Sequence, residues 1–331
     1  MKRILAVLFA VVLGAGVLCG CNDSPKGKVE ELEELKGRVV YSIGQGQVPD
    51  LVFRYLLKEA GVEYRLADTA KEGVVSLAYV SEGTEIVGGL AAGQMNYGVL
   101  SEPAATVALK NAAGTSRMID IQALYKKVTG SKNGYPQAAL VVKKDFLAAH
   151  PGYVAAFVAA FEAGAKWAET EPDGALAEIR KAGSTTVPML TAEIAKGCNL
   201  GFTPAADCKA QLVSFYNGLN DVKDEGTAPV GAKLPNDDFY RGEITGEAET
   251  GVRAKVYAPD GAPAISLAKM IYDGFDADFS VVPPANIMAK VMTDADIAVM
   301  PANAAAAKAD DAGIVMLGVT NFGSLYMVGK E

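Results

Sequence analysis

The sequence predicts a bilobed α/β protein, because two stretches of the chain repeat one plan. Residues 38–142 run strand, glycine/proline turn and helix, then strand and proline turn, and close on strand, aromatic turn and strand. Residues 254–328 repeat that series. Alternating strands and helices favour two mainly parallel sheets flanked by helices. Two similar halves with matching turns at their strand ends indicate a ligand cleft between them.

The first half contains elements with clear boundaries. An apolar, β-branched run at 39–43 predicts a strand, and the helix predicted at 49–60 is stopped by a glycine. Residues 78–80 and 97–100 predict two further strands, with a helix at 84–92 between them. This succession of strand and helix is typical of a sheet covered on both faces.

The middle of the chain changes character. Residues 153–169 place apolar side chains on one face of a helix. Three or four helices continue from there to about residue 218, and the stretch 242–251 is acidic, glycine-containing and aperiodic. We expect that stretch to be an exposed linker, after which the second α/β half begins at residue 252.

The first residues have the features of an export signal. Lys2 and Arg3 precede an apolar run at 4–18, which leads to Leu18-Cys19-Gly20-Cys21. This last sequence resembles the lipobox of bacterial lipoproteins, which implies cleavage before Cys21 and acylation of its thiol. The alternative is a single transmembrane helix, but the run is shorter than the roughly 20 residues that a span needs. We therefore expect an extracytoplasmic protein, lipid-anchored to the bacterial membrane at the cell surface or in the periplasm.

The charge and the cysteines narrow the classes of partner. The formal net charge is −8 at pH 7, and removal of residues 1–20 takes away two cations and brings it to −10. Such acidity argues against nucleic acid as a partner. Cys198 and Cys208 are the remaining cysteines, and an exported setting permits a disulfide between them. Two buried thiols are the alternative, and a zinc site is not expected without histidine neighbours.

Seven short segments, spread over nearly the whole exported chain, resemble one family. This family is the group of ABC-importer substrate-binding proteins that includes sulfonate, taurine, nitrate and pyrimidine-precursor binders (the NMT1/THI5-like group). The segments are 35–46, 90–94, 101–104, 135–142, 258–263, 296–303 and 323–328.

The order of the segments departs from that family. In its usual members the piece like 252–328 comes first and the piece like 36–240 follows, so this chain resembles a circular permutant. Permutation is tolerated where the old termini lie close together and the new ones lie at the surface. The alternative is a misassembled gene. We expect both new termini at a crossover between the lobes, with one of the two crossovers cut.

The resemblance implies a periplasmic-binding-protein-like (type II) fold, circularly permuted, and a division of the chain. The expected parts are a signal peptide at 1–20, a tether at 21–35, lobe one at 36–139, a helical segment on the other lobe at 140–241, the linker at 242–251 and the core of lobe two at 252–331. It also implies a monomer that captures a small organic molecule between the lobes and delivers it to an ABC permease.

Ligands of open parallel sheets bind beyond the carboxyl ends of the strands. Six turns qualify, three in each half, and polar or aromatic residues in them are the candidate ligand contacts. These residues are Gln45, Gly46, Gln47, Glu102, Tyr135, Gln137, Asp260, Gly261, Asn303, Asn321 and Phe322.

Each candidate has a structural alternative. The loop after residue 43 lacks a full G-x-G-x-x-G, because Pro49 stands at the last glycine position. It either brings helix N-terminal amides to a polar or anionic group or is only a tight turn. Glu102 and Asp260 either accept a ligand donor or cap a helix. Tyr135 and Phe322 either stack on a planar ligand or pack in the core.

Catalytic chemistry is not expected. The chain has one histidine, His150, at a helix start, and it contains no G-x-S-x-G, H-E-x-x-H or P-loop motif. We therefore expect no catalytic residues, no cofactor and no metal site. Two other functions stay open, a pyrimidine-synthase-like enzyme and a ligand-sensing lipoprotein without a transporter. The preferred ligand class is a planar heterocycle such as a vitamin precursor, with a sulfonate-type anion as the runner-up.

Overall fold

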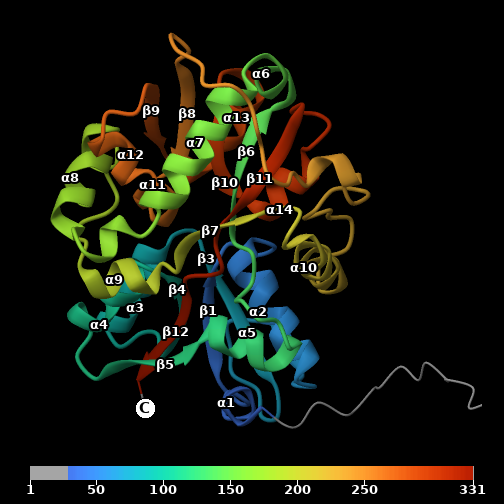
Figure 1. Cartoon of the computed structure of the whole chain (residues 1–331). Helices are drawn as coiled ribbons and strands as arrows, with labels where there is room; N and C mark the ends of the chain where they lie inside the picture. The colour runs from blue at the N-terminus through green and yellow to red at the C-terminus, as the bar shows by residue number, and fades with distance from the viewer. Residues whose placement is uncertain (1–28, 331) are drawn as a thin grey trace, which may run out of the picture.

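A computed structural model describes residues 29–330 and contains two six-stranded sheets (Figure 1). The signal peptide, Cys21 and the first residues of the tether lie outside the described residues. Sheet A, in lobe one, has the order β2-β3-β1-β4-β12-β5. Its strands are β1 (Val39–Ile43), β2 (Tyr64–Leu66), β3 (Val75–Val80), β4 (Tyr97–Ser101), β5 (Thr115–Asp120) and β12 (Leu325–Lys330).

Sheet B, in lobe two, has the order β7-β11-β6-β10-β8-β9. Its strands are β6 (Ala138–Lys143), β7 (Leu200–Pro204), β8 (Ala254–Pro259), β9 (Ala277–Val282), β10 (Ile297–Pro301) and β11 (Ile314–Asn321).

Five strands of each sheet share one topology, and the sixth strand, β2 in sheet A and β7 in sheet B, is added at opposite edges. In sheet A, β1 pairs in parallel with β3 and β4, and β12 then lies antiparallel between β4 and β5. In sheet B, β8 pairs in parallel with β9 and β10, and β6 lies antiparallel between β10 and β11. Each sheet therefore accepts one strand from the chain that arrives from the other lobe. This shared order confirms the predicted bilobed α/β class, although both sheets are mixed.

Helices cover both faces of sheet A. Apolar residues of α3 and α4 form a small core with β4 and β12, whereas α2 and α5 pack on the opposite face. In α2, Leu51, Val52 and Leu56 are buried in the core on this opposite face, and the helix lies where 49–60 was predicted. The helices of this lobe are α1 (Glu30–Glu33), α2 (Val48–Glu59), α3 (Gly83–Ala91), α4 (Ala104–Asn111) and α5 (Ile121–Thr129).

The helical segment after β6 divides between the lobes. Its helices α7, α8 and α9 join the core on one face of sheet B, whereas α10 packs against α2 of lobe one. Further short helices follow the strands of lobe two. The bounds are α6 (Lys144–Ala149), α7 (Pro151–Gly164), α8 (Pro172–Lys181), α9 (Ala192–Gly197), α10 (Lys209–Asp221), α11 (Ala262–Ile265), α12 (Ala268–Tyr272), α13 (Ile287–Thr293) and α14 (Ala302–Ala307), with 3-10 turns at Trp167–Glu169, Asp237–Phe239 and Pro284–Asn286.

Two crossovers connect the lobes, and both are continuous. Residues 130–137 lead from α5 to β6, and residues 322–324 lead from β11 to β12. The prediction that one crossover is cut is therefore wrong, because the chain ends after β12 rather than before it. Residues 325–330 accordingly lie in sheet A, not in the core of lobe two. The crossovers touch, since a Cβ added at Gly134 would lie 2.0 Å from the carbonyl oxygen of Phe322.

The two ends of the described chain lie at the same pole of lobe one (Figure 1). A cavity of about 330 Å³ there is lined in part by Glu31 of α1 and by Met327 of β12. Glu31 pairs with Lys127 of α5 at 2.9 Å, and the Lys330 amide donates to the Asn96 carbonyl at 3.0 Å. Both ends are thus packed on lobe one, at a distance from lobe two.

The stretch 242–251 is largely exposed but is fixed near its end. Glu249 accepts hydrogen bonds from the backbone amides of Gly152 at 2.8 Å and Tyr153 at 3.3 Å, at the start of α7. Its other oxygen lies 2.9 Å from His150 Nδ1. The single histidine therefore occupies a half-exposed helix boundary.

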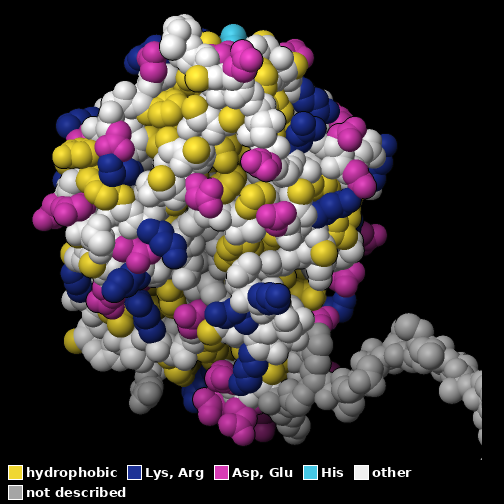
Figure 2. Space-filling view, in the orientation of Figure 1, with side chains coloured by type: hydrophobic (Ala, Val, Ile, Leu, Met, Phe, Trp, Pro, Cys, Tyr) yellow, Lys and Arg dark blue, Asp and Glu magenta, His cyan; other side chains and the backbone are white. Residues whose placement is uncertain are grey.

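Among residues 29–330 there is no helix long and apolar enough to cross a membrane. Acidic and basic side chains are interspersed over the face of the molecule in Figure 2.

Candidate functional site

The candidate site is the seam where the strand ends of the two lobes meet the crossovers. In each sheet the chain order reverses between two parallel strands, β1 and β4 in sheet A and β8 and β10 in sheet B, which is where ligands of such sheets bind. The Glu102 amide donates to the Ser324 carbonyl, and the Ala302 amide donates to the Gln137 carbonyl, each at 3.0 Å. The loops after β4 and β10 are thereby fixed to the crossovers.

Gln137 forms hydrogen bonds with residues of both crossovers. Its backbone amide donates to the Asn321 carbonyl at 3.1 Å. Its side-chain oxygen accepts from the hydroxyls of Tyr135 and Ser324, each at 3.1 Å. These two bonds orient the side-chain amide, and among the described residues its Nε2 has no hydrogen-bond acceptor. Gln137 is half-buried, so this donor is a candidate ligand contact.

The loop after β1 lies on a buried charged cluster, which we call the Arg54 cluster (Asp50, Arg54, Tyr79 and Asp224). Arg54 Nε donates to Asp50 Oδ1 at 2.8 Å, and its Nη1 donates to Asp224 Oδ1 at 2.7 Å. The Tyr79 hydroxyl donates to Asp50 at 2.9 Å, and Asp50 and Arg54 are only 1% and 2% exposed. None of the four residues was a sequence candidate.

The Arg54 cluster fixes the predicted turn. The Gly46 amide donates to Asp50 Oδ2 at 2.7 Å, and Gln45 Nε2 donates to Asp224 Oδ2 at 3.1 Å. Burial raises the pKa of Asp50, although the Gly46 amide and Arg54 oppose this shift. The hydrogen bond from Arg54 lowers the pKa of Asp224. The cluster therefore fixes the loop and also attaches the segment after α10 to lobe one.

Glu102 is buried and its carboxylate is engaged. Thr106 donates to it from its backbone amide at 3.2 Å and from its hydroxyl at 3.0 Å, and Arg117 forms an ion pair with it. Burial raises the pKa of Glu102, against the effect of Arg117. The contacts with Thr106 match the helix-capping alternative, and the contact with Arg117 orients that cation.

Asp260 holds a loop within lobe two. Ser184 Oγ donates to its carboxylate at 2.6 Å, and the amides of Thr185 and Thr186 each donate at 2.8 Å. Burial alone would raise the pKa of Asp260, but these three donors outweigh it and lower the pKa. Gly261, at φ +114, follows it and begins α11.

We expect Asp260→Asn to lower the unfolding free energy by about 2 kcal/mol at pH 7, because charge-assisted hydrogen bonds are lost. Because the pKa of Asp260 is lower in the folded state, its ionisation stabilises the protein fully at pH values above the unfolded-state pKa of about 3.9. This stabilisation is lost as the pH falls through the folded-state pKa. The difference between wild type and variant, measured by urea unfolding, is therefore expected to shrink below about pH 4. A difference that stays constant down to pH 3 would show that the charge of Asp260 contributes nothing.

The remaining candidates divide between the core and the seam. Asn303 Nδ2 donates to the Pro229 carbonyl at 2.9 Å, and Asn321 Nδ2 lies 3.4 Å from the Cys198 carbonyl. The side-chain oxygens of both asparagines are buried without a hydrogen-bond donor among the described residues. Gln47 is exposed and Phe322 is half-buried.

Tyr135 lies in the core. It is 0% exposed, and its ring packs against Tyr125 and Phe215 with centroid distances of 5.9 Å to each. The ring-stacking interpretation of Tyr135 does not hold in this structure, because no face of the ring is open. The two turn aromatics therefore do not form a matched pair around a ligand.

Cys198 and Cys208 are free thiols in this structure, so the buried-thiol alternative holds and the disulfide alternative does not. Burial raises the pKa of Cys208 to about 12 and that of Cys198 still further above its usual value. Neither thiol is suited to nucleophilic or metal chemistry at neutral pH. Among residues 29–330 there is also no group of three or more histidine, cysteine or acidic side chains that could hold a metal ion.

A pocket of about 410 Å³ opens at the seam, and we call it the seam pocket. Lobe one contributes residues of β5 and β12, and α9 contributes the opposite wall. The lining residues are Arg117, Asp120, Glu193, Lys196, Gly197 and Tyr326. Sequence reasoning missed all six, because they follow no turn motif and come from three distant segments.

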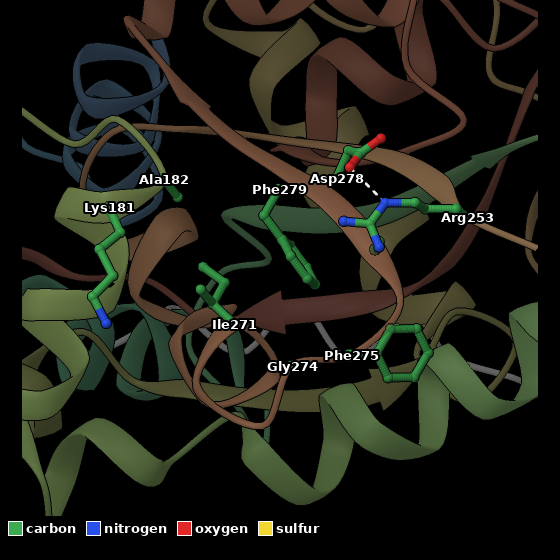
Figure 3. Close-up of a pocket in the computed structure, with 9 residues that line it drawn as sticks. Lys181, Ala182, Arg253, Ile271, Gly274, Phe275, Asp278 and Phe279 are labelled. Carbon is green, nitrogen blue, oxygen red and sulfur yellow. Dashed lines mark hydrogen bonds and ion pairs between the residues drawn. The ribbon is translucent and has the colours of Figure 1, made fainter.

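A second pocket, of about 400 Å³, lies at the outer edge of lobe two beside β9 (Figure 3). Arg253, on its rim, donates to Asp278 at 2.7 Å and to Asp276 at 2.5 Å. Phe275, Phe279 and Ile271 supply apolar surface. Because it touches lobe two only, this pocket is a weaker candidate than the seam pocket.

Comparison with known proteins supports the family resemblance. Residues 23–182, just under half of the chain, match the model of the NMT1-like family. No curated protein matches the chain.

Solved structures give only distant likenesses. The alkanesulfonate-binding protein SsuA from Xanthomonas axonopodis pv. citri, bound to MOPS, is 11% identical with a TM-score of 0.33, over 90% of this chain and 66% of that one. A binding component of an ABC phosphonate transporter from Pseudomonas aeruginosa is 8% identical with a TM-score of 0.36, over 89% and 69%.

The LysR-family regulator CbnR, complexed with its target DNA, is 12% identical with a TM-score of 0.35 over 88% of this chain. This chain spans 62% of the length of that regulator. TM-scores this low support no conclusion about what this chain binds.

The fold and the family therefore agree with the resemblance predicted from the sequence. Both lobes have the strand order of a periplasmic-binding-protein-like (type II) fold. Over residues 23–182, this sequence is similar to the NMT1-like family.

Proposed function

We propose that this protein is an extracytoplasmic solute-binding protein that captures a small molecule at the seam and delivers it to an ABC importer. The observation that supports this most is the pair of lobes with one shared strand order, joined by two continuous crossovers at the edge where their parallel strands end. The NMT1-like match over residues 23–182 adds to it. No enzymatic activity is part of the proposal.

Closure of the two lobes on the ligand would be the working motion. Ligand binding shifts an open–closed equilibrium by its differential affinity for the two states. The crossovers are the natural hinge, since Gly134 and Gly323 lie where they touch and Gly323 has a φ of +90. The loops after β1, β4, β8 and β10 would close on the ligand.

Several predictions from the sequence belong to this proposal. They are export by the signal at 1–20, acylation of Cys21, a monomer outside the membrane, and ligand contacts from the turn residues. The proposed tether is shortened to 21–28, because Leu32 and Leu35 are buried in the core of lobe one and the predicted bound at residue 35 is wrong. Gln45, Gln47, Gln137 and Gly261 are the turn residues that support it best, because they are exposed or half-buried in the structure. The proposed partners are a small-molecule ligand and an ABC permease.

The test is thermal unfolding of residues 29–331 with pyrimidines, flavins, aromatic acids, amino acids, sulfonates and nitrate. A ligand at 100 times its Kd is expected to add about 2.7 kcal/mol, which is a shift of roughly 5–10 °C for a chain of this size. X-ray scattering with the same ligand is expected to show a smaller radius of gyration. A ligand that shifts the melting temperature without compaction would contradict closure, and turnover of that ligand would replace the proposal with an enzyme.

We further propose that the chain is a circular permutant, because α1 and the end of β12 meet at one pole of lobe one. Glu247 and Ala248, in the linker, are both exposed. A rearranged chain that starts at Ala248, joins 331 to 29 by a short flexible linker and ends at Glu247 is expected to keep the circular dichroism spectrum and to melt within a few degrees of the original.

The control is a chain opened between Pro301 and Ala302, where the backbone is engaged with the Gln137 carbonyl. This variant is expected not to fold. If neither rearranged chain folded, the proposal that this chain is a circular permutant would be contradicted.

A further inference from the structure

The seam pocket contains an arginine that is fixed on one side and loosely paired on the other. Arg117 Nη2 donates to Thr106 Oγ1 at 2.7 Å and pairs with Glu102, and the guanidinium lies 4.6 Å from the ring centroid of Tyr326. These contacts come from three elements of lobe one. The guanidinium therefore keeps its orientation whether or not lobe two is in place.

The other nitrogen of this guanidinium faces α9 of lobe two. Arg117 Nη1 lies 3.8 Å from Glu193 Oε1, which is too far for a hydrogen bond. The Glu193 side chain is 76% exposed, so this ion pair is weak and easily replaced. Glu193 thus occupies the position of an anion on Arg117 without binding it firmly.

A second cation lies beside that position. Lys196 follows Glu193 by three residues, which places both on one face of α9, and both line the pocket. Among the described residues, no carboxylate lies within ion-pair distance of Lys196. Two cations, one from each lobe, therefore line one small pocket together with the exposed Glu193.

Asp120 supplies an acceptor on the lobe-one wall. Its Oδ1 accepts from the Ala123 amide at 2.8 Å and from Gln122 Nε2 at 3.2 Å. Among the described residues its Oδ2 receives no hydrogen bond. The pocket therefore offers cationic donors to an anion and a free carboxylate oxygen to an ammonium group.

We propose that the seam pocket binds a small zwitterion, whose anionic group displaces Glu193 to bind Arg117 and Lys196 while its ammonium group binds Asp120. The inference rests on the proposed solute-binding function and names the ligand class for it. The Glu193 carboxylate then competes with the ligand's anionic group for Arg117 and moves away from Arg117 when the ligand binds. Because Arg117 belongs to lobe one and Lys196 to lobe two, the ligand's anionic group also links the lobes.

The test is calorimetric titration of the purified protein with ω-amino carboxylates of two to five carbons, each beside the matched alkylamine and alkyl carboxylate. At least one amino carboxylate is expected to bind about tenfold or more tightly than both of its matched analogues, because each lacks one charge-assisted contact. Lys196→Gln is expected to weaken that binding about tenfold. Glu193→Gln is expected to strengthen it about threefold, because removal of a like charge and a competitor favours the anion.

Lys181→Gln is the matched control, since Lys181 lies on the rim of the other pocket and pairs with Glu178 at 2.6 Å. It is expected to leave the affinity unchanged. Binding that is indifferent to both Lys196→Gln and Glu193→Gln would overturn the inference. The inference would also be overturned if no amino carboxylate bound either the wild type or Glu193→Gln. If a ligand of another class then compacted the protein, the proposed solute-binding function would still hold. An amino carboxylate that binds with the expected dependence but causes no compaction would support the pocket and overturn closure.

Discussion

Replacing Asp50 by asparagine is expected to lower the unfolding free energy by about 3 kcal/mol. Removal of one partner of a buried ion pair costs roughly 3–5 kcal/mol, because the other charge stays buried without compensation. The lower end applies here, since Arg54 keeps its contact with Asp224 at 2.7 Å. The variant also replaces one of the two acceptor oxygens by an NH2 donor, so the side chain can no longer accept from the Gly46 amide, Arg54 and Tyr79 together, and the turn after β1 is expected to loosen. Urea unfolding at pH 7 measures the change.

Asp278→Asn is the control for charge removal. Asp278 pairs with Arg253, but the two side chains are 58% and 55% exposed, so a change within about 0.5 kcal/mol is expected. If Asp50→Asn cost no more than this control, Asp224 alone would satisfy Arg54. A larger loss in the double variant with Asp224→Asn than the sum of the single variants would show that both acids stabilise the same cation.

Replacing Tyr135 by alanine is expected to cost about 3–5 kcal/mol, because a fully buried aromatic ring is removed and a cavity remains. Tyr135→Phe keeps the ring and removes only the hydrogen bond to Gln137, so about 1 kcal/mol is expected. Thermal or urea unfolding of the three proteins without ligand distinguishes these effects.

The same variants decide between core packing and ligand stacking. A core residue changes the unfolding free energy of the ligand-free protein and leaves the ligand affinity of Tyr135→Phe nearly unchanged. Small losses of stability together with a large loss of affinity in Tyr135→Ala would restore the stacking interpretation. Phe322 is half-buried, so Phe322→Ala serves as a comparison for an aromatic at the other crossover.

Much of the fold could be predicted, because its signals are local. The β-branched run at 39–43 and the glycine that stops the helix at 49–60 are short patterns, and the structure has β1 and α2 there. The repeated order of elements predicted two similar sheets, and five strands of each sheet share one topology. These elements could be predicted from short stretches of sequence, without knowing which distant residues contact them.

The site was predicted less well, because its partners are remote in the sequence. Glu102 and Asp260 were found by their places after strands, but their alternatives stayed open until Arg117 and Ser184 were seen beside them. The contact between Arg54 and Asp224 joins residues 170 positions apart, and no pattern in the sequence announces it. An aromatic residue in a turn also gives no sign of which neighbour covers its ring, as Tyr135 shows.

The crossovers were mispredicted for a related reason. The sequence showed that the chain ends near a crossover but not on which side of it. Sheet pairing decides this point, since β12 forms antiparallel pairs with both β4 and β5 and completes its passage between the lobes. The last six described residues therefore act as an interior strand of lobe one.

If the lobes close as proposed, the position of the two described chain ends decides which lobe would move when the protein is attached. Both ends leave from the pole of lobe one that is remote from the seam (Figure 1). Any attachment through either end, to a lipid, a surface or a fused protein, would hold lobe one still and let lobe two swing. A load applied between the two ends would pull on sheet A alone and leave the hinge unstressed. A fluorescent reporter of the motion therefore belongs on lobe two, for example on exposed Tyr272.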